Sequence, residues 1–307
     1  MNKPYLDPSK RHEFVLLFDV KDGNPNGDPD AGNMPRVDPE TMQGLVTDVA
    51  LKRKVRDYVT LVKQNDDGYK IFIQSEAALN ALIEDAAKAA DSSVKEKLEQ
   101  YDKLSKKEKD QLKARPNRNV CKELCQRYYD IRLFGGVLST GKLNAGQVRG
   151  PVQLTFARSL DPVLPLDLSI TRVAITTQED LEKKSSEMGR KPLVPYGLYR
   201  AHGFFNPFLA AQTGVSQDDL KLFWDALVHL FDFDRSAARG EMNVRGLVVF
   251  THENKKGNAP AHKLFELVDI RKNDGVESPR KFSDYAVSIS EAPKGVEVSL
   301  LVDPRSS

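Results

Sequence analysis

The sequence has few of the features that mark secreted, membrane-spanning or metal-binding proteins. Only two of its 307 residues are cysteines, Cys121 and Cys125. Their spacing of four positions on a predicted helix fits two buried or half-buried thiols better than a metal site, which needs two further ligands nearby. No stretch approaches the roughly 18 apolar residues of a membrane span, and residues 1–5 contain no apolar targeting segment. We therefore expect a cytoplasmic protein without a disulfide framework, a structural metal or a membrane.

The chain also lacks a strong net charge and a recognisable catalytic constellation. Its 46 Lys and Arg residues nearly balance 44 Asp and Glu residues, which leaves a formal net charge of +2. Any site for a polyanion must therefore come from local clusters of basic residues. The five histidines are scattered without metal-ligand spacing, and no nucleophile stands beside a base. We expect no catalytic residue, no metal and no cofactor.

Two motifs resemble known sites but each departs from its pattern at a chemically essential position. Residues 22–33 place oxygen side chains at alternate positions like a calcium loop, but the twelfth position is Asn33, where a bidentate glutamate is needed. Residues 136–143 match a phosphate-binding loop up to Leu143, which replaces the hydroxyl residue that holds magnesium. Neither calcium binding nor nucleotide hydrolysis is expected.

The hydrophobic pattern predicts a mixed fold over residues 1–307 as one domain. Expected elements are strands at 13–20 and 69–73, a helix at 39–63, helices within 75–118 and at 117–132, strands near 152–158, 166–176 and 196–199, a helix at 216–231, and strands at 244–252, 263–270 and 296–302. Strand–helix–strand, repeated with large insertions, indicates an antiparallel α+β fold of the RRM or ferredoxin type. The charged segment 75–118 is expected to be a helical surface insertion, and the polar segment 177–195 a protruding element.

The densest basic cluster lies on the first long helix. Residues 51–56 include Lys52, Arg53, Lys54 and Arg56, and Lys52 and Arg56 share one face. That face lies about 100° round the helix from Leu51, so we expect it to be exposed and to be replaceable without loss of the fold. The cluster can bind a nucleic acid, or it can be a solvated stripe in which Asp48 pairs with Lys52.

Two further basic clusters lie in predicted loops. Lys142, Gln147 and Arg149 alternate with glycines, which let a backbone approach a phosphate while the cations neutralise it. The alternative is a polar surface loop. Arg235 and Arg239 form the third cluster, and they can bind phosphate or pair with neighbouring carboxylates.

Taken together, ten segments resemble the Csd-type backbone subunit of the subtype I-C CRISPR Cascade complex, which belongs to the RAMP superfamily. These segments occur in family order over most of the chain: 18–29 (FDVKDGNPNGDP), 33–36 (NMPR), 47–49 (TDV), 51–53 (LKR), 130–135 (DIRLFG), 146–153 (GQVRGPVQ), 196–199 (YGLY), 202–204 (HGF), 213–214 (TG) and 234–236 (DRS). The charged insertion at 75–118 carries little of the resemblance.

The resemblance implies an RRM-like palm, a helical insertion at 75–118 and a thumb-like hairpin at 173–196, with Met188 as its wedge residue. It also implies that copies line up along a guide RNA (crRNA), that each thumb reaches over the next copy, and that the guide is presented to target DNA in antiviral defence. Further implied partners are the target DNA strand and other Cascade subunits. The first loop, with Asn24, Asn26 and Arg36, would join the basic helix and the 142–150 loop in lining the RNA groove.

Two alternatives stay open at this stage. Related backbone subunits of type III complexes cut target RNA with an acid in the loop after the first strand, and this loop holds Asp22, Asp28, Asp30 and Asp38. An endoribonuclease would therefore use one of these acids. A general single-strand binder is the other alternative, but the sequence shows no paired surface aromatics on which bases would stack.

Overall fold

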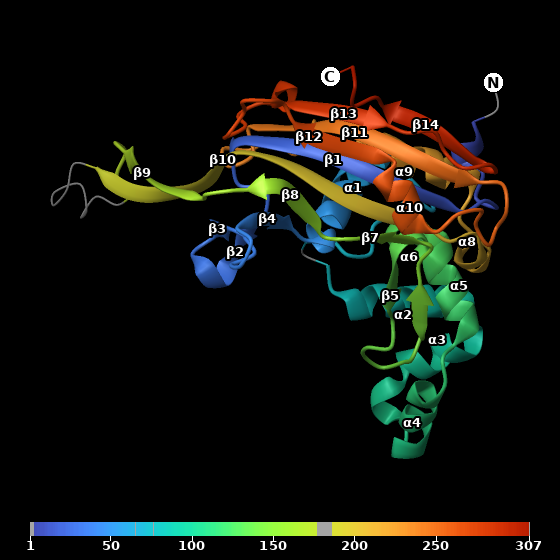
Figure 1. Ribbon diagram of the computed structural model, residues 1–307. Helices are drawn as coiled ribbons and strands as arrows, with labels where there is room; N and C mark the ends of the chain where they lie inside the picture. Colours follow the sequence, from blue (N-terminus) through green and yellow to red (C-terminus); the bar gives the residue numbers. More distant parts are fainter. Residues whose placement is uncertain (1–2, 65, 76, 177–185, 307) are drawn as a thin grey trace.

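The computed structural model describes residues 3–64, 66–75, 77–176 and 186–306, and its central feature is a twisted antiparallel sheet (Figure 1). The strands follow the order β14-β11-β1-β10-β8-β4. Their bounds are Val296–Val302 for β14, Glu241–His252 for β11, His12–Gly23 for β1, Glu187–Phe205 for β10, Ala157–Pro162 for β8 and Gln43–Val46 for β4, and the short β7 (Val152–Leu154) also pairs with β10. Strand β1 lies in the middle, antiparallel to β10 and to β11.

The sheet and two helices make the expected palm. Along the chain β1 is followed by α1 (Asp48–Lys63), β8, β10, α9 (Gln217–Val228) and β11, so the core is a strand–helix–strand–strand–helix–strand unit. All strand pairs of the sheet are antiparallel. The predicted α+β class with an RRM-like palm is confirmed.

One face of the sheet packs on α1 and α9 because apolar residues match the period of each element. Helix α1 starts at the Thr47 cap, whose side chain accepts the Ala50 amide, and α9 starts in a capping box at Ser216. Buried apolar side chains recur on α1 at helical spacing and on β1 at every second residue. The core between them includes Phe14, Leu16, Phe18, Leu51, Val55, Val59, Phe223 and Trp224.

The other face of the sheet is covered as well. Val15 and Leu17 point to this face, where α10 (Ala261–Glu266) and the hairpin of β12 (Val268–Lys272) and β13 (Tyr285–Ile289) pack over the sheet. Because both faces of the sheet are covered, neither face is open to a ligand. A candidate site must therefore lie beside the sheet, along the helices and loops that cover it.

The chain from α2 to β6 forms a second body, the helical lobe, which lies below the sheet in Figure 1. Its elements are α2 (Leu79–Ala90), α3 (Ser92–Glu99), η3 (Tyr101–Lys103), α4 (Lys106–Ala114), α5 (Arg118–Arg127), α6 (Tyr129–Phe134) and the hairpin of β5 (Gly135–Val137) and β6 (Gln147–Arg149). The lobe has its own apolar core, which includes Ile83, Leu98, Val120, Leu124 and Ile131. Residues 79–114 are thus mainly helical, as expected for the insertion.

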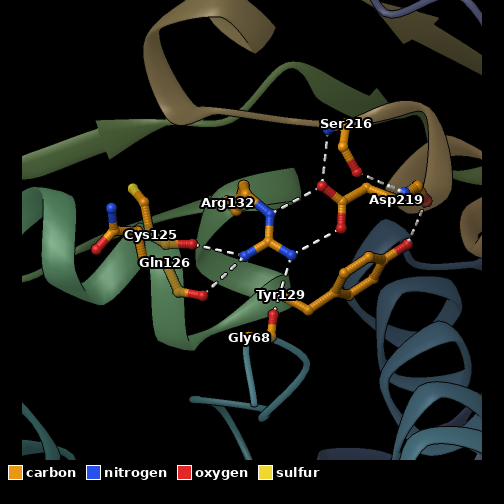
Figure 2. A network of polar contacts seen from close by, with 7 residues as sticks. All are labelled: Gly68, Cys125, Gln126, Tyr129, Arg132, Ser216 and Asp219. Atoms are coloured by element: carbon orange, nitrogen blue, oxygen red, sulfur yellow. Dashed lines mark hydrogen bonds and ion pairs between the residues drawn. The ribbon is translucent and has the colours of Figure 1, made fainter. Parts of the chain in front are cut away.

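Helix α6 ties the helical lobe to the palm through a buried ion pair (Figure 2). Arg132 donates from Nη2 to Asp219 Oδ1 at 2.7 Å and from Nε to Asp219 Oδ2 at 3.0 Å. The Tyr129 hydroxyl donates to the Asp219 carbonyl at 3.0 Å, and Arg132 also donates to the carbonyls of Cys125 and Gly68. With its donors satisfied, Arg132 anchors α6 to the start of α9, since a buried pair of this kind is costly to break.

A two-stranded hairpin projects from the sheet (Figure 1). Strand β9 (Leu166–Arg172) pairs with the first part of β10, from Leu166 opposite Leu193 to Arg172 opposite Glu187. The hairpin therefore starts nearer the N-terminus than the predicted range 173–196, and Tyr196 already pairs with Lys21 in the main sheet. Residues 177–185 of the predicted thumb lie outside the described residues.

Three expected elements differ in the structure. The helix expected from residue 39 begins at Asp48, because Met42 has a φ of +56° and residues 43–46 form the edge strand β4. The strand expected at 69–73 is irregular, and the Phe72 and Ile73 amides bond to a side chain instead. The strand expected at 263–270 begins as helix α10.

The remaining elements are short: η1 (Pro4–Leu6), β2 (Gly27–Asp28), η2 (Pro29–Ala31), β3 (Met34–Pro35), α8 (Pro207–Thr213) and η4 (Phe282–Asp284). None of the helices in the described parts of the chain is long and apolar enough to cross a membrane. Strands β2 and β3 pair within the loop after β1, so this loop is a folded unit.

A buried histidine gives the fold a predictable pH dependence. Burial lowers the pKa of His12 to about 4, and its Nδ1 and Nε2 contact Thr251 Oγ1 and the Asp7 carbonyl, both at 3.0 Å. Between pH 6.5 and 4 the unfolded chain binds a proton that the folded chain does not, so the free energy of unfolding should fall as pH falls. The contribution of His12 to this loss should approach about 3 kcal/mol at pH 4, and His202, whose pKa burial also lowers to about 4, adds a contribution of its own. Urea titrations at several pH values measure the free energy of unfolding. Its dependence on pH should be weaker in His12→Phe and unchanged in the control His262→Gln, which alters an exposed histidine. Equal pH dependence in the two variants would contradict the role of His12.

Candidate nucleic-acid interface

Three adjoining hollows, two of them lined by α1 and the third continuing to β6, are together called the α1 groove. The main hollow, of about 1180 Å³, lies between the first loop, α1, the 71–75 segment and the end of α6. A second hollow of about 370 Å³ shares Asn26 and Arg53 with it and extends to the 234–239 loop. A third of about 250 Å³ shares Phe134 and Gly135 with it and extends to β6. The α1 groove thus joins the palm to the helical lobe.

The α1 groove brings together residues that are far apart in the sequence. Of the eleven residues predicted to bind RNA, nine line one of the three hollows: Asn24, Asn26, Arg36, Lys52, Arg53, Arg56, Gln147, Arg149 and Arg239. They come from the first loop, α1, β6 and the 234–239 loop. The structure thus places these nine residues along one groove. Contact of each residue with RNA stays a prediction.

The two asparagines of the first loop also shape its backbone. Asn26 Oδ1 accepts the Thr47 amide at 3.0 Å, so this side chain ties the loop to the start of α1. Asn24 is buried, and its Nδ2 donates to the Asn33 carbonyl at 2.7 Å. Arg36 stands beside Asp28, with Nη1 3.3 Å from Oδ2. The loop is therefore held in one shape at the mouth of the groove.

The basic residues at positions 52–56 of α1 are paired, and two of them, Lys54 and Arg56, are buried. Lys52 Nζ lies 2.8 Å from Asp48 Oδ2, as the solvated-stripe alternative anticipated. Arg56 has only 10% of its side chain exposed, and its Nε donates to the buried Asp130 at 2.8 Å. The expectation that Arg56 is freely replaceable is wrong, because Arg56→Glu would set two carboxylates against each other in the interior.

Two arginines of the α1 groove are held far more loosely. Arg53 leaves 71% of its side chain exposed and lies 3.7 Å from Asp57, a distance typical of a weak surface pair. Arg149 and Gln147 are both exposed on β6, and among the described residues the Arg149 side chain has no hydrogen bond or ion pair. These two side chains can turn toward a phosphate at little cost.

The other predicted basic residues are differently placed. Lys142 does not line the groove; its Nζ lies 3.4 Å from Glu84 Oε2 and 5.3 Å from the Tyr101 ring of the helical lobe. Arg239 pairs with Asp234, which also pairs with Lys54, so the carboxylate alternative for this cluster is confirmed for Arg239. Arg235 donates to the Gly240 carbonyl at 2.9 Å and lies outside the three hollows.

The glycines around β5 and β6 serve internal packing. Gly135 has a φ of +79°, and a Cβ added at Gly150 would lie 2.1 Å from the Phe134 carbonyl carbon. Only glycine fits where the two backbones come this close. The loop between β5 and β6 leads from strand to strand, not into a helix, so the phosphate-loop likeness has no matching structure.

Sequence reasoning missed the apolar part of the groove. Val49, Leu61 and Ile73 line the main hollow with 63%, 54% and 47% of their surface exposed. Phe134 lies beside them, with the Arg56 guanidinium 5.4 Å from its ring centroid. The signal was present in α1, where Val49 and Leu61 fall outside the buried stripe of the helix. Exposed apolar side chains next to cations suit a ligand with both apolar and anionic parts.

Two acids of the first loop, Asp28 and Asp38, are each paired with an arginine. Asp38 lies 2.8 Å from Arg158 Nη1, and this hydrogen bond lowers the pKa of Asp38, which makes it a weak base. Asp28 accepts the Asp30 amide and faces Arg36. Among the described residues, no group of three or more His, Cys, Asp or Glu side chains is arranged to hold a metal ion.

Comparisons with known proteins agree with this architecture. A family model described as CRISPR-associated protein Cas7 matches residues 10–290. A CRISPR-associated protein Cas7 from Haloferax volcanii (strain DS2) is 27% identical over 312 positions, which cover 94% of this chain and 83% of the relative. A chain of a CRISPR RNA-guided surveillance complex in a pre-nicking state is similar in fold, with a TM-score of 0.51, 14% identity and coverage of 81% of this chain and 79% of that one.

Proposed function

The chain belongs to the Cas7 family of CRISPR-associated proteins, and from this premise we propose that it is a guide-RNA-binding backbone subunit of a surveillance complex. Several copies bind along one crRNA and hold it extended for pairing with a target. The structural neighbour named above comes from an RNA-guided surveillance complex, which supports the proposal. The observation that carries it is the α1 groove, where four distant segments bring nine predicted RNA-binding residues together.

The chemistry of the α1 groove suits a nucleic-acid backbone better than individual bases. Arg53 and Arg149 supply exposed cations for phosphates, and Val49, Leu61 and Ile73 supply apolar surface for riboses or base faces. Contacts to phosphate and sugar fix position without reading sequence. A guide held in this way keeps its base edges for pairing, as RNA-guided recognition requires.

We further assign the chain to the Csd-type subunit of subtype I-C, on the ten motif segments that follow that family's order. The target is then a DNA strand, the partners are other Cascade subunits and further copies of this chain, and the complex works in the cytoplasm in antiviral defence. Residues 166–172 and 187–193 form the base of the thumb, and Met188, 79% exposed and opposite Thr171, is kept as the proposed wedge.

The proposed subunit is not an enzyme, and this separates it from a type III-like endoribonuclease. Purified protein with Mg²⁺ or Mn²⁺ should bind a labelled guide RNA, and a complementary RNA added to it should remain uncut. Specific cleavage that Asp38→Ala or Asp28→Ala abolishes would establish the nuclease alternative and overturn ours. The Asp303→Asn variant, which alters a partly exposed acid outside the α1 groove, is the matched control for cleavage.

A further inference from the structure

Asp130 belongs to the DIRLFG segment, and the proposed function does not by itself explain why an acid stands there. Its side chain is 0% exposed, and it accepts three hydrogen bonds from two different segments of the chain. We propose that Asp130 is a positioning residue that presets the α1 groove for one backbone phosphate, bound by Arg56. This inference rests on the proposed function, since it concerns how the same groove grips RNA.

Asp130 holds two walls of the main hollow, and the first of them is the Arg56 side chain on α1. Asp130 Oδ2 accepts Arg56 Nε at 2.8 Å, which fixes the plane of the guanidinium. Phe134 supports the group, with its ring centroid 5.4 Å from Arg56 Cζ. The two Nη atoms form no hydrogen bond with other described residues, and Arg56 lines the main hollow. A guanidinium held by its Nε keeps its two Nη groups as a fork that matches a phosphate.

The second wall is the irregular segment 71–75. Here the Phe72 amide donates to Asp130 Oδ1 at 2.8 Å and the Ile73 amide donates to Oδ2 at 3.1 Å. The segment forms no strand or helix, so without this carboxylate two amides would lack partners, one of them on the buried Phe72. Ile71, Ile73, Gln74 and Ser75 line the main hollow on this side. One carboxylate therefore holds both walls and sets the distance between them.

The isosteric change Asp130→Asn tests this role. An asparagine keeps the shape and can still accept one amide, but its Nδ2 cannot accept Arg56 Nε. The guanidinium is then free to turn out of the groove, and the 71–75 segment loses one of its two ties. RNA affinity should fall at least about tenfold, and the slope of log K against log salt should decrease in magnitude by about 0.7, the value for one phosphate on a single strand.

The Arg132–Asp219 pair provides a matched control from the same helix. The pair (Figure 2) is also buried and joins the same two bodies. Neither of its residues lines the α1 groove. Asp219→Asn should lower the unfolding temperature about as much as Asp130→Asn. At a temperature where circular dichroism shows both variants folded, it should leave RNA affinity within about twofold and the salt slope unchanged.

The experiment is fluorescence anisotropy of a labelled single-stranded guide RNA over a series of salt concentrations. Equal losses of affinity in the two variants would reduce Asp130 to a structural residue and overturn the inference. If Asp130→Asn does not fold, Arg56→Lys provides the test instead. The single ammonium of the lysine would pair with Asp130 and leave no donor for the phosphate, so the same loss of RNA affinity and of salt slope is expected. RNA binding equal to that of the wild type would refute the inference. Failure of the wild-type protein to bind RNA would instead refute the proposed function.

Discussion

Replacing Arg53 and Arg149 together by glutamate should abolish guide-RNA binding at physiological salt and leave the fold intact. Both side chains are exposed, and they approach the α1 groove from opposite ends, one on α1 and one on β6. Each substitution removes a cation and adds an anion, so the affinity should fall by about 100-fold or more. Surface changes of this kind typically alter the free energy of unfolding by about 0.5 kcal/mol or less.

The control for this prediction changes the same number of charges elsewhere. Lys106→Glu with Lys107→Glu alters α4, at the far end of the helical lobe from the α1 groove. We expect this variant to retain most of the RNA affinity in the anisotropy assay. Comparable losses in both double variants would mean that overall charge, and not the groove, governs binding.

Removing the projecting hairpin should prevent several copies from assembling on one RNA while each copy remains folded. All seven residues of β9 are exposed, including the apolar Leu168 and Ile170, so the hairpin contributes almost nothing to the core. Exposed apolar residues on a projecting strand pair indicate a surface that a partner covers. A short Gly-Ser linker in place of 167–192 retains Leu193, which is buried, and the part of β10 that pairs with β1.

The measurement for the hairpin variant is size-exclusion chromatography with a long guide RNA. We expect single copies bound independently in place of a regular multi-subunit particle. Met188→Ala, a single change on the same hairpin, is the control and should still assemble. If the variant lacking 167–192 forms the full-size particle, the hairpin is a passive extension and copies contact one another elsewhere.

The sequence was sufficient to predict the elements whose residues obey a single local period. The apolar run of β1 and the stripe of Leu51, Val55 and Val59 on α1 predicted the two layers of the palm because each element is buried on a face that its own spacing defines. The resemblance carried by the motif segments then predicted that the first loop, the basic helix and the 142–150 loop line one groove. Of the eleven proposed contact residues, nine line the α1 groove for this reason.

What the sequence could not show depends on pairs that are distant along the chain. Arg56 looked like an exposed cation because its partner, Asp130, is 74 positions away and belongs to a different body. A separation of 58 positions between Phe72 and Asp130 likewise hid the role of residues 71–75, whose apolar run resembles a strand although its amides bond to a carboxylate. The glycines of the 142–150 loop were interpreted as room for a phosphate, and the close approach of Gly150 to Phe134 emerged only from the fold.

The most direct test of the central claim is the mass of complexes formed with guide RNAs of increasing length. Native mass spectrometry of the wild-type protein should show the copy number rising in single steps, with a constant number of nucleotides added per copy and no shortening of the RNA. A copy number that does not depend on RNA length, or RNA that is shortened during the experiment, would contradict a backbone that assembles along its guide.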